Sequence, residues 1–186
     1  MAKNKKIVFE IEFRRKRKWK GQSSIYSKKF NFMAGSTELY RIGKIGRDEK
    51  GRFYDYVIRI TLAETNIEGT VSHDEFARLF GKARESFILE YLPEIAEMMG
   101  KAFLLQTRNA SYDFRKNCRF GELMIIRLRI LRIGDTSFEI GAEFINAQTK
   151  EVYAIGKQVI ISTNLKGIPT KIPEKLRNTL LKYLAK

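Results

Sequence analysis

The sequence predicts an α+β fold for residues 52–186, preceded by a basic N-terminal extension over residues 1–51. An alternating apolar pattern near the start of this domain predicts one strand. An aromatic-rich helical face follows it, and four strand-like segments occupy the second half of the chain. One strand, one long helix and then a series of antiparallel strands are typical of an α+β domain.

The N-terminal extension carries most of the net charge. The chain has 186 residues and a net charge of +15, and residues 1–50 contain 15 Lys and Arg against 5 Asp and Glu. Residues 7–13 and 28–33 each have a strand-like pattern, which makes a β-hairpin possible. Between them lies the basic run 14–20, which contains Trp19. Three interpretations stay open for this run: a solvated strand end, attraction to an acidic partner protein, or contact with nucleic acid or lipid.

The first element of the domain is a strand with one buried face. Apolar side chains alternate with mostly polar ones over nine positions. The apolar positions are Tyr54, Tyr56, Ile58, Ile60 and Leu62.

A helix is predicted from Ser72 onward. Ser72 and Glu75 have the spacing of a capping box, in which the two side chains satisfy free N–H groups at the helix start. Apolar residues then recur with helical spacing, so one face of the helix must be covered by a large apolar surface. They are Phe76, Leu79, Phe80, Ala83 and Phe87.

The remaining elements follow from turn signals and alternation. Pro93 suits the first turn of a short second helix that Gly100 ends. Strands are predicted at 102–114, 122–133, 136–147 and 152–163, and a change of apolar spacing after Arg129 predicts a β-bulge. A basic helix over about residues 173–184 closes the chain.

Several classes of protein are disfavoured. The sequence has no apolar run of 18 residues and no signal-peptide pattern, so we expect a cytoplasmic protein with no membrane span. Cys118 is the only cysteine, which excludes an intrachain disulfide and a cysteine zinc site. No glycine-rich phosphate loop, Gly-x-Ser-x-Gly elbow or His-rich cluster is present, and we expect no metal or cofactor.

Five local motifs carry a resemblance to a known family. The loop Glu64-Thr65-Asn66-x-x-Gly69-x-Val71 comes first, followed by the helix segment 81–85 that contains Arg84. The turn 120–123, the strand 154–158 and the tail 171–177 complete the set. In this order they resemble the hotdog-fold thioesterases of the 4-hydroxybenzoyl-CoA thioesterase-like superfamily. The resemblance covers residues 52–183 and implies an antiparallel sheet wrapped around one long helix.

Asn66 departs from the usual motif of the superfamily, and this departure narrows the resemblance to one type of thioesterase. Many members of the superfamily have a catalytic carboxylate where this chain has Asn66, and an amide is neither a nucleophile nor a useful base at neutral pH. Glu64-Thr65-Asn66 followed by Arg84 is similar to the enediyne polyketide thioesterase type, which lacks that acid. The resemblance implies release of an acyl or polyketide chain from an acyl carrier protein or CoA. It also implies a homodimer or homotetramer, and no cofactor beyond the pantetheine arm of the substrate.

The resemblance also implies roles for individual residues. The backbone N–H of His73, at the helix start, would form an oxyanion hole for the thioester carbonyl. Asn66 would hold the attacking water or the carbonyl, and Arg84 would orient Asn66 or stabilise negative charge. Glu68, and after it Glu64, are alternative general bases. The residues expected to contact substrate are Gly69, Thr70, Val71, Ser72 and Tyr112.

Structural interpretations compete with these roles. Asn66 could form an Asx turn, Arg84 could be a solvated helix residue, and the His73 side chain could face solvent. Tyr112 and Phe114 could line an acyl pocket or belong to the core.

Cys118 and the wider function have alternatives too. The cysteine lies between Lys116 and Arg119, which could lower its pKa, but we interpret it as a partly buried bystander. Two other functions remain open, a CoA thioesterase of primary metabolism and a non-catalytic acyl-CoA-binding regulator with its basic arm on DNA. The lack of a DNA-reading helix disfavours nucleic acid.

Overall fold

The structure is a computed structural model that describes residues 42–186. The basic run 14–20 and the two strands predicted at 7–13 and 28–33 lie outside these residues. None of the helices between residues 42 and 186 has the length and apolarity that a membrane span requires.

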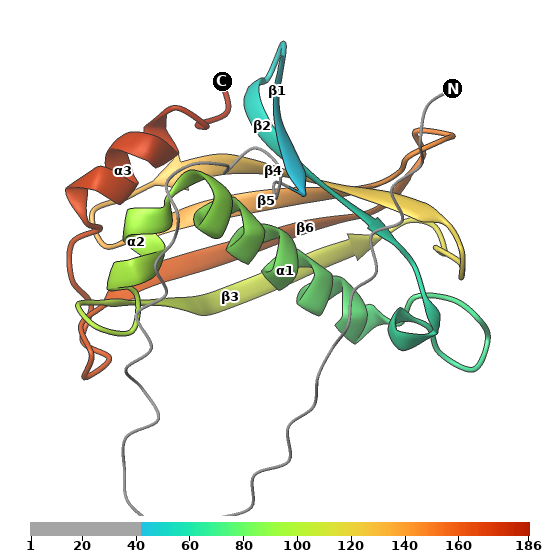
Figure 1. Cartoon of the computed structure of the whole chain (residues 1–186), viewed down its shortest axis with the longest axis horizontal. Helices are drawn as coiled ribbons and strands as arrows, with labels where there is room; N and C mark the ends of the chain where they lie inside the picture. Colours follow the sequence, from blue (N-terminus) through green and yellow to red (C-terminus); the bar gives the residue numbers. More distant parts are fainter. Residues whose placement is uncertain (1–41) are drawn as a thin grey trace, which may run out of the picture. The chain divides into compact units, whose positions relative to one another are not determined.

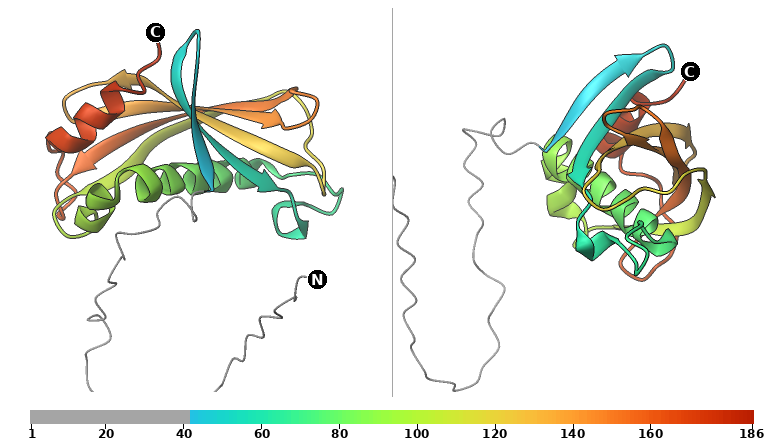
Figure 2. Two further views of the ribbon diagram at one scale, coloured as in Figure 1. Left: turned by 45° about the horizontal axis from the view of Figure 1, so that its top comes forward. Right: turned by 90° about the vertical axis from the view of Figure 1, so that its right-hand side faces the viewer.

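One antiparallel sheet wraps around one long helix (Figures 1 and 2). The sheet has six strands in the order β1-β2-β4-β5-β6-β3, so β1 and β3 form its two edges. The strands are β1 Gly43–Asp48, β2 Gly51–Arg59, β3 Leu104–Phe114, β4 Leu123–Ile133, β5 Ser137–Asn146 and β6 Val152–Thr163. The helices are α1 His73–Tyr91, α2 Pro93–Met98 and α3 Glu174–Leu181.

The core lies between α1 and the concave face of the sheet. The predicted apolar face of α1 is buried, with Leu79, Phe80 and Ala83 fully inaccessible to solvent. Phe76 and Phe80 pack edge-on against Phe144 of β5, with ring centroids 5.0 and 6.2 Å apart. These contacts join α1 to the centre of the sheet, and the predicted α+β hotdog fold is confirmed.

The strand predictions hold for the second half of the chain. Each of the last four strands begins and ends within two residues of its predicted bounds. The predicted bulge in β4 is also present, because the register between β4 and β5 shifts between Ile130 and Arg132. The short helix α2 begins at Pro93, and Gly100 follows it with a φ of 76°.

The structure has a strand, β1, within the part of the chain that was predicted to be the N-terminal extension. β1 pairs with β2 along its whole length, although no strand was predicted between residues 33 and 52. The glycines of β1 are needed because aromatic rings of β2 lie across them. A Cβ on Gly43 would lie 2.1 Å from the ring of Tyr54, and one on Gly46 would lie 2.3 Å from the ring of Phe53. The boundary between extension and domain at residue 51 stays a prediction.

Two details of the segment before α1 were predicted wrongly. Leu62 was predicted to lie on the buried face of the first strand, but the pairing of β2 with β4 ends at Arg59. Leu62 instead begins a 3-10 turn, Leu62–Glu64, and is 77% exposed. The capping box at Ser72 and Glu75 is absent, because the Ser72 hydroxyl donates to Asp74 and Glu75 pairs with Arg78. A capping box forms instead at Thr61 and Glu64.

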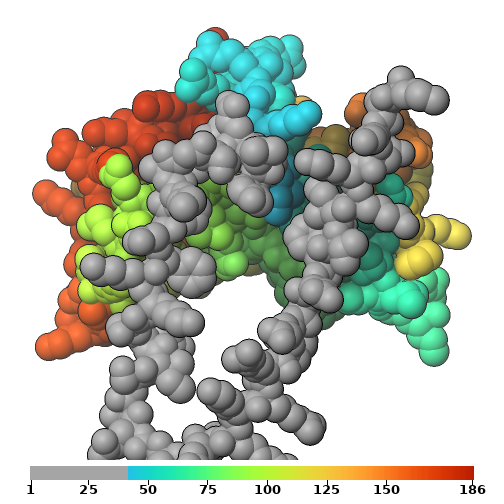
Figure 3. Space-filling model, in the orientation of Figure 1, coloured from blue at the N-terminus to red at the C-terminus, as the bar shows by residue number. Residues whose placement is uncertain are grey.

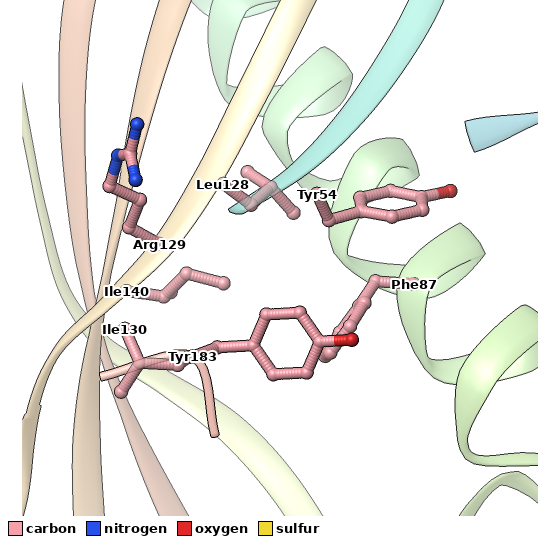
Figure 4. Close-up of a pocket in the computed structure, with 7 residues that line it drawn as sticks. All are labelled: Tyr54, Phe87, Leu128, Arg129, Ile130, Ile140 and Tyr183. Carbon is pink, nitrogen blue, oxygen red and sulfur yellow. The ribbon is translucent and has the colours of Figure 1, made fainter. Parts of the chain in front are cut away.

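The end of the core next to α3 is closely packed. Tyr183 contacts Phe87 of α1, with ring centroids 5.0 Å apart, and a void of about 10 Å³ remains among the residues shown in Figure 4. Arg129 points away from the aromatic rings in that view. A void of this size holds about one water at most, so this part of the interior has no room for an acyl chain.

Candidate active site

The loop between β2 and α1 is organised by the side chain of Asn66. Its Oδ1 accepts hydrogen bonds from the backbone N–H of Glu68 at 3.0 Å and from the N–H and hydroxyl of Thr70, both at 3.2 Å. Three donors on one atom identify it as the amide oxygen. The Asx turn considered from the sequence is therefore present, and Gly69 completes it with a φ of 71°.

The amide nitrogen of Asn66 is the group that remains for a ligand. Within residues 42–186 no hydrogen bond involves Nδ2, and the residue is exposed. A carboxylate here would present a negatively charged acceptor, whereas Asn66 presents a donor. Its chemistry therefore suits a carbonyl oxygen or the lone pair of a water.

The start of α1 lies beside a surface hollow of about 330 Å³. His73 is the first residue of the helix, and its ring lies edge-on to Phe114 of β3 with centroids 4.6 Å apart. Because the Ser72 hydroxyl bonds to Asp74, it does not cap the N–H groups of the first turn. The lining residues are Val71, His73, Phe76, Phe114, Arg115, Lys116 and Asn117. Thus the hollow joins an apolar wall to a basic rim at a helix N-terminus.

Arg84 belongs to a second polar cluster, between the middle of α1 and the edge of the sheet. Its Nη1 donates to Gln158 of β6 at 2.8 Å and to Thr107 of β3 at 3.0 Å. Gln158 in turn donates to the hydroxyl of Tyr112 at 3.1 Å. Burial lowers the pKa of Arg84 and raises that of Tyr112. Arg84 is therefore held half-buried by neutral oxygens rather than solvated.

Asn66 and Arg84 do not meet within one chain. Arg84 lies eleven residues beyond His73 on α1, which corresponds to about 16 Å along the helix axis. Its hydrogen bonds go to β3 and β6, and those of Asn66 stay within its own loop. In a single chain, Arg84 therefore does not orient Asn66.

The two acidic residues of the loop have different environments. Glu64 is buried and accepts from the hydroxyl and N–H of Thr61 at 2.5 and 2.9 Å, with Lys82 at 3.8 Å. The Thr61 hydroxyl is the main reason that the pKa of Glu64 is lowered. Oε2 of Glu64 is thus used by the 3-10 turn and Oε1 faces Lys82, whereas Glu68 is exposed at the tip of the loop.

Cys118 is fully buried, and burial raises its pKa to about 12. Desolvation outweighs the hydrogen bonds from Tyr153 and the Arg119 backbone, which lower the pKa. This thiol is not a nucleophile at neutral pH. No group of three His, Cys, Asp or Glu side chains suited to a metal ion is found in the part of the chain that the structure describes.

The sequence matches one protein family. Residues 60–180 match the thioesterase-like superfamily. The chain belongs to this superfamily. Its membership confirms the predicted enzyme class, a thioesterase. Comparison with curated proteins gave no match.

Solved structures with the same fold include named thioesterases. The dynemicin thioesterase is 20% identical, with a TM-score of 0.67 over 71% of this chain and 97% of its own. A 1,4-dihydroxy-2-naphthoyl-CoA thioesterase from Synechocystis is 20% identical, with a TM-score of 0.63 over 69% and 96%. A gentisyl-coenzyme A thioesterase is 22% identical, with a TM-score of 0.59 over 68% and 98%. At these identities the likeness shows a shared fold.

Some residues around the candidate site were not found from the sequence. Gln158 and Thr107, which hold Arg84, lie on strands that are far from α1 in the chain. A glutamine two residues after Gly156, in a mostly apolar strand, was an available signal, because a polar side chain on the inner face of a sheet needs a partner. The space-filling view places the Asn66 loop and α3 at opposite ends of the face shown (Figure 3).

Proposed function

We propose that the protein hydrolyses an acyl thioester, releasing an acyl or polyketide chain from an acyl carrier protein or CoA, without an acidic nucleophile. The observation that carries the proposal is the Asn66 loop, where the amide oxygen is fully used and Nδ2 is left to face a ligand. The fold likeness to the dynemicin thioesterase, whose structures describe polyene binding, supports a long acyl substrate. A cytoplasmic location remains part of this proposal.

The chemistry requires a donor site at the thioester oxygen. Water attacks the carbonyl carbon and gives up one proton, and the tetrahedral oxyanion then collapses to a carboxylic acid and a thiolate. The proton taken from water passes to the thiolate, which leaves as a thiol. The backbone N–H of His73 and Asn66 Nδ2 would stabilise the oxyanion, an effect worth about a hundredfold in rate for one donor. Glu68 is the proposed acceptor of the proton from water. Gly69, Thr70, Val71 and Ser72 would contact the substrate, and Tyr112 would flank the Arg84 cluster.

A homodimer would complete this site. β3 is an edge strand of eleven residues, and an unpaired edge of this length favours pairing with another strand. Antiparallel pairing of two β3 strands about their middle would set residue 114 of one beside residue 104 of the other. Phe114 lies against His73, and Thr107 binds Arg84. The pairing would therefore bring the helix start of one chain toward Arg84 of its partner subunit. A homotetramer would pair two such dimers.

Hydrolysis assays test the proposed chemistry. We expect turnover of acyl-CoA or acyl-carrier thioesters, and a loss of about a hundredfold in kcat/KM for Asn66→Ala with little change in folding. Asn66→Asp should alter hydrolysis without abolishing it, since the backbone donors stay in place. Glu68→Gln tests the proton acceptor. Binding of acyl-CoA without any turnover would instead support the non-catalytic regulator.

Subunit mixing tests the shared site. Light scattering should show at least a dimer at micromolar concentration. Asn66→Ala and Arg84→Ala variants should each lose about a hundredfold in activity, but a mixed dimer would carry one intact site and one doubly altered site. Random mixing should then restore about a quarter of the wild-type activity. A monomer, or the absence of any recovery in confirmed mixed dimers, would contradict the shared site.

Carrier binding by the basic extension is a separate part of the proposal. Carrier proteins are typically acidic, and residues 1–50 carry a net charge of +10. Neutralising Arg14, Arg15, Arg17 and Lys18 should raise KM for carrier-bound thioesters but leave short thioester analogues unchanged. The penalty should shrink with salt, because the screening length falls from about 10 Å at 0.1 M to about 3 Å at 1 M. Equal losses on both substrates would contradict carrier binding, and tight salt-sensitive binding of duplex DNA would favour the regulator.

A further inference from the structure

The turn of residues 118–122, just before β4, is the support on which the Asn66 loop lies. Near the end of the loop, the Val71 N–H donates to Cys118 O at 2.8 Å and the Phe120 N–H donates to Gly69 O at 3.0 Å. At the beginning, Ile60 exchanges backbone hydrogen bonds of 2.9 Å with Gly121 and Glu122. Both ends of the loop therefore take their position from one five-residue turn.

One side-chain oxygen holds this turn in shape. Glu122 Oε2 accepts from the backbone N–H of Arg119 at 2.7 Å and from the hydroxyl of Tyr153 at 2.9 Å. The Tyr153 hydroxyl in turn accepts from the side-chain amide of Asn146, at the end of β5. Tyr153 is 1% exposed and Asn146 is 7% exposed. A carboxylate in the turn is thus tied through a buried tyrosine to the central strands of the sheet.

The charge state of Glu122 suits this role. Burial raises its pKa, but the hydrogen bonds from Arg119, Tyr153 and Cys118 outweigh burial and the net shift is downward. Burial also raises the pKa of Tyr153, so its hydroxyl keeps its proton and donates at neutral pH. The pair is therefore an ionised acceptor and a neutral donor, a strong type of hydrogen bond.

We propose that Glu122 and Tyr153 are positioning residues for thioester hydrolysis, which act by fixing the turn that supports Asn66 and the start of α1. The inference depends on the proposed role of Asn66. Neither side chain lines the hollow beside α1, so their effect is transmitted through the backbone of the turn and the loop. Displacement of catalytic groups by about 1 Å can cost up to about a hundredfold in rate.

Paired variants at Glu122 test the inference. The Arg119 N–H and the Tyr153 hydroxyl converge on Oε2, so the amide oxygen of Glu122→Gln can accept these two hydrogen bonds. Glu122→Met keeps the side-chain length and accepts neither. We expect Glu122→Met to lower kcat by about 10- to 100-fold with KM within about twofold. Glu122→Gln should stay within about threefold of wild type. Hydrogen exchange should show faster exchange of the Val71 and Phe120 amides in Glu122→Met only.

Tyr153→Phe tests the same link from the sheet side. It should lower kcat by about tenfold, while Tyr183→Phe, which removes a hydroxyl from another buried tyrosine below α3, should leave kcat unchanged. In an Asn66→Ala background, Tyr153→Phe and Glu122→Met should each cost less activity than in the wild type, because part of their effect acts through Asn66. Full additivity, or equal losses in Glu122→Gln and Glu122→Met, would overturn the inference. If Asn66→Ala were inactive and Glu122→Met fully active, the positioning role of Glu122 would be refuted but the proposed function would stand. A fully active Asn66→Ala would refute the proposed function itself.

Discussion

Two arginine clusters on opposite faces of the sheet differ in how their charge is balanced. On the outer face, Arg127 makes two hydrogen bonds of 2.8 Å to Asp55, and Arg129 pairs with Asp48. Arg127 also stacks on the Phe53 ring at 3.7 Å. Toward α1, Arg84 bonds to the neutral side chains of Thr107 and Gln158. Among residues 42–186 no ion pair includes Arg84, although Glu85 attracts it at longer range.

The difference indicates which cluster is structural. On the outer face, opposite charges and a ring satisfy one another, and the hydrogen bond to Asp55 raises the pKa of Arg127. Such a cluster stabilises the β1–β2 hairpin and needs no ligand. A half-buried cation with neutral partners keeps its positive field, because hydroxyl and amide oxygens do not cancel its charge. Arg84 is therefore suited to a developing anion.

The largest expected effect is the loss of hydrolysis on removal of Arg84, which should distinguish its cluster from that of Arg127 and Arg129. Arg84→Ala should lower kcat/KM by about a hundredfold, because charge stabilisation in the transition state is lost. Its melting temperature should change little, since a half-buried cation is removed together with its desolvation cost. Steady-state hydrolysis and thermal unfolding measure the two quantities.

Arg127→Ala is the matched control. It leaves Asp55 without its bidentate partner and should cost about 2 kcal/mol of stability, or about 4–8 °C in Tm. Hydrolysis should stay within about twofold of wild type, because the outer face does not border the candidate site. Loss of activity in both variants in proportion to their Tm would abolish the distinction between the clusters.

Gly156 offers a smaller and indirect change to the Arg84 cluster. The Tyr112 ring lies directly on this glycine, and a Cβ would come within 2.9 Å of Tyr112 and 3.2 Å of Phe80. Gly156→Ala should therefore displace Tyr112 and cost about 1–3 kcal/mol of stability. Hydrolysis should fall as well, since Tyr112 holds Gln158 against Arg84. Denaturant unfolding and kcat/KM measure the two effects.

Gly81 provides the control on α1 itself. Nothing lies within 4 Å of a Cβ at this helical glycine. Gly81→Ala should stabilise the protein by about 0.5–1 kcal/mol, because alanine loses less backbone entropy in a helix. If Gly156→Ala were equally stabilising, the Tyr112 ring would not be fixed against β6.

The sequence predicted the elements well and the polar clusters only in part. Strands β3 to β6 and the buried face of α1 follow from alternation and helical spacing, which are local patterns. Asn66 and Arg84 were found through local motifs, but their partners were not. Gln158 lies 74 residues from Arg84, and Tyr153 lies 31 residues from Glu122. Such pairs depend on the register between strands, which local patterns do not specify.

The capping box at the start of the loop predicts a pH effect on stability. The pKa of Glu64 is lowered, so its stabilising contribution is present above its unfolded pKa, near 4.3, and is lost as pH falls through the folded value. Glu64→Gln should cost about 1 kcal/mol at pH 7. The difference between the two proteins should shrink as pH falls below the unfolded pKa and vanish once pH is below the lowered folded pKa. A constant difference between pH 7 and pH 3 in denaturant unfolding would contradict this assignment.

Cys118, a buried residue of the loop support, should show the smallest effect on activity. Its pKa of about 12, raised by burial from 9.0, makes the thiolate fraction at pH 8 about a thousandfold smaller than in an exposed cysteine. The native enzyme should therefore keep its hydrolysis rate during treatment with iodoacetamide at pH 8. Mass spectrometry should find Cys118 modified only when denaturant unfolds the protein, since full burial also blocks the reagent. Rapid modification of the folded enzyme with loss of activity would show that the turn of residues 118–122 opens in solution. The hydrogen bonds that join this turn to Gly69 and Val71 would then not be persistent, and the loop of Asn66 would lose its fixed support.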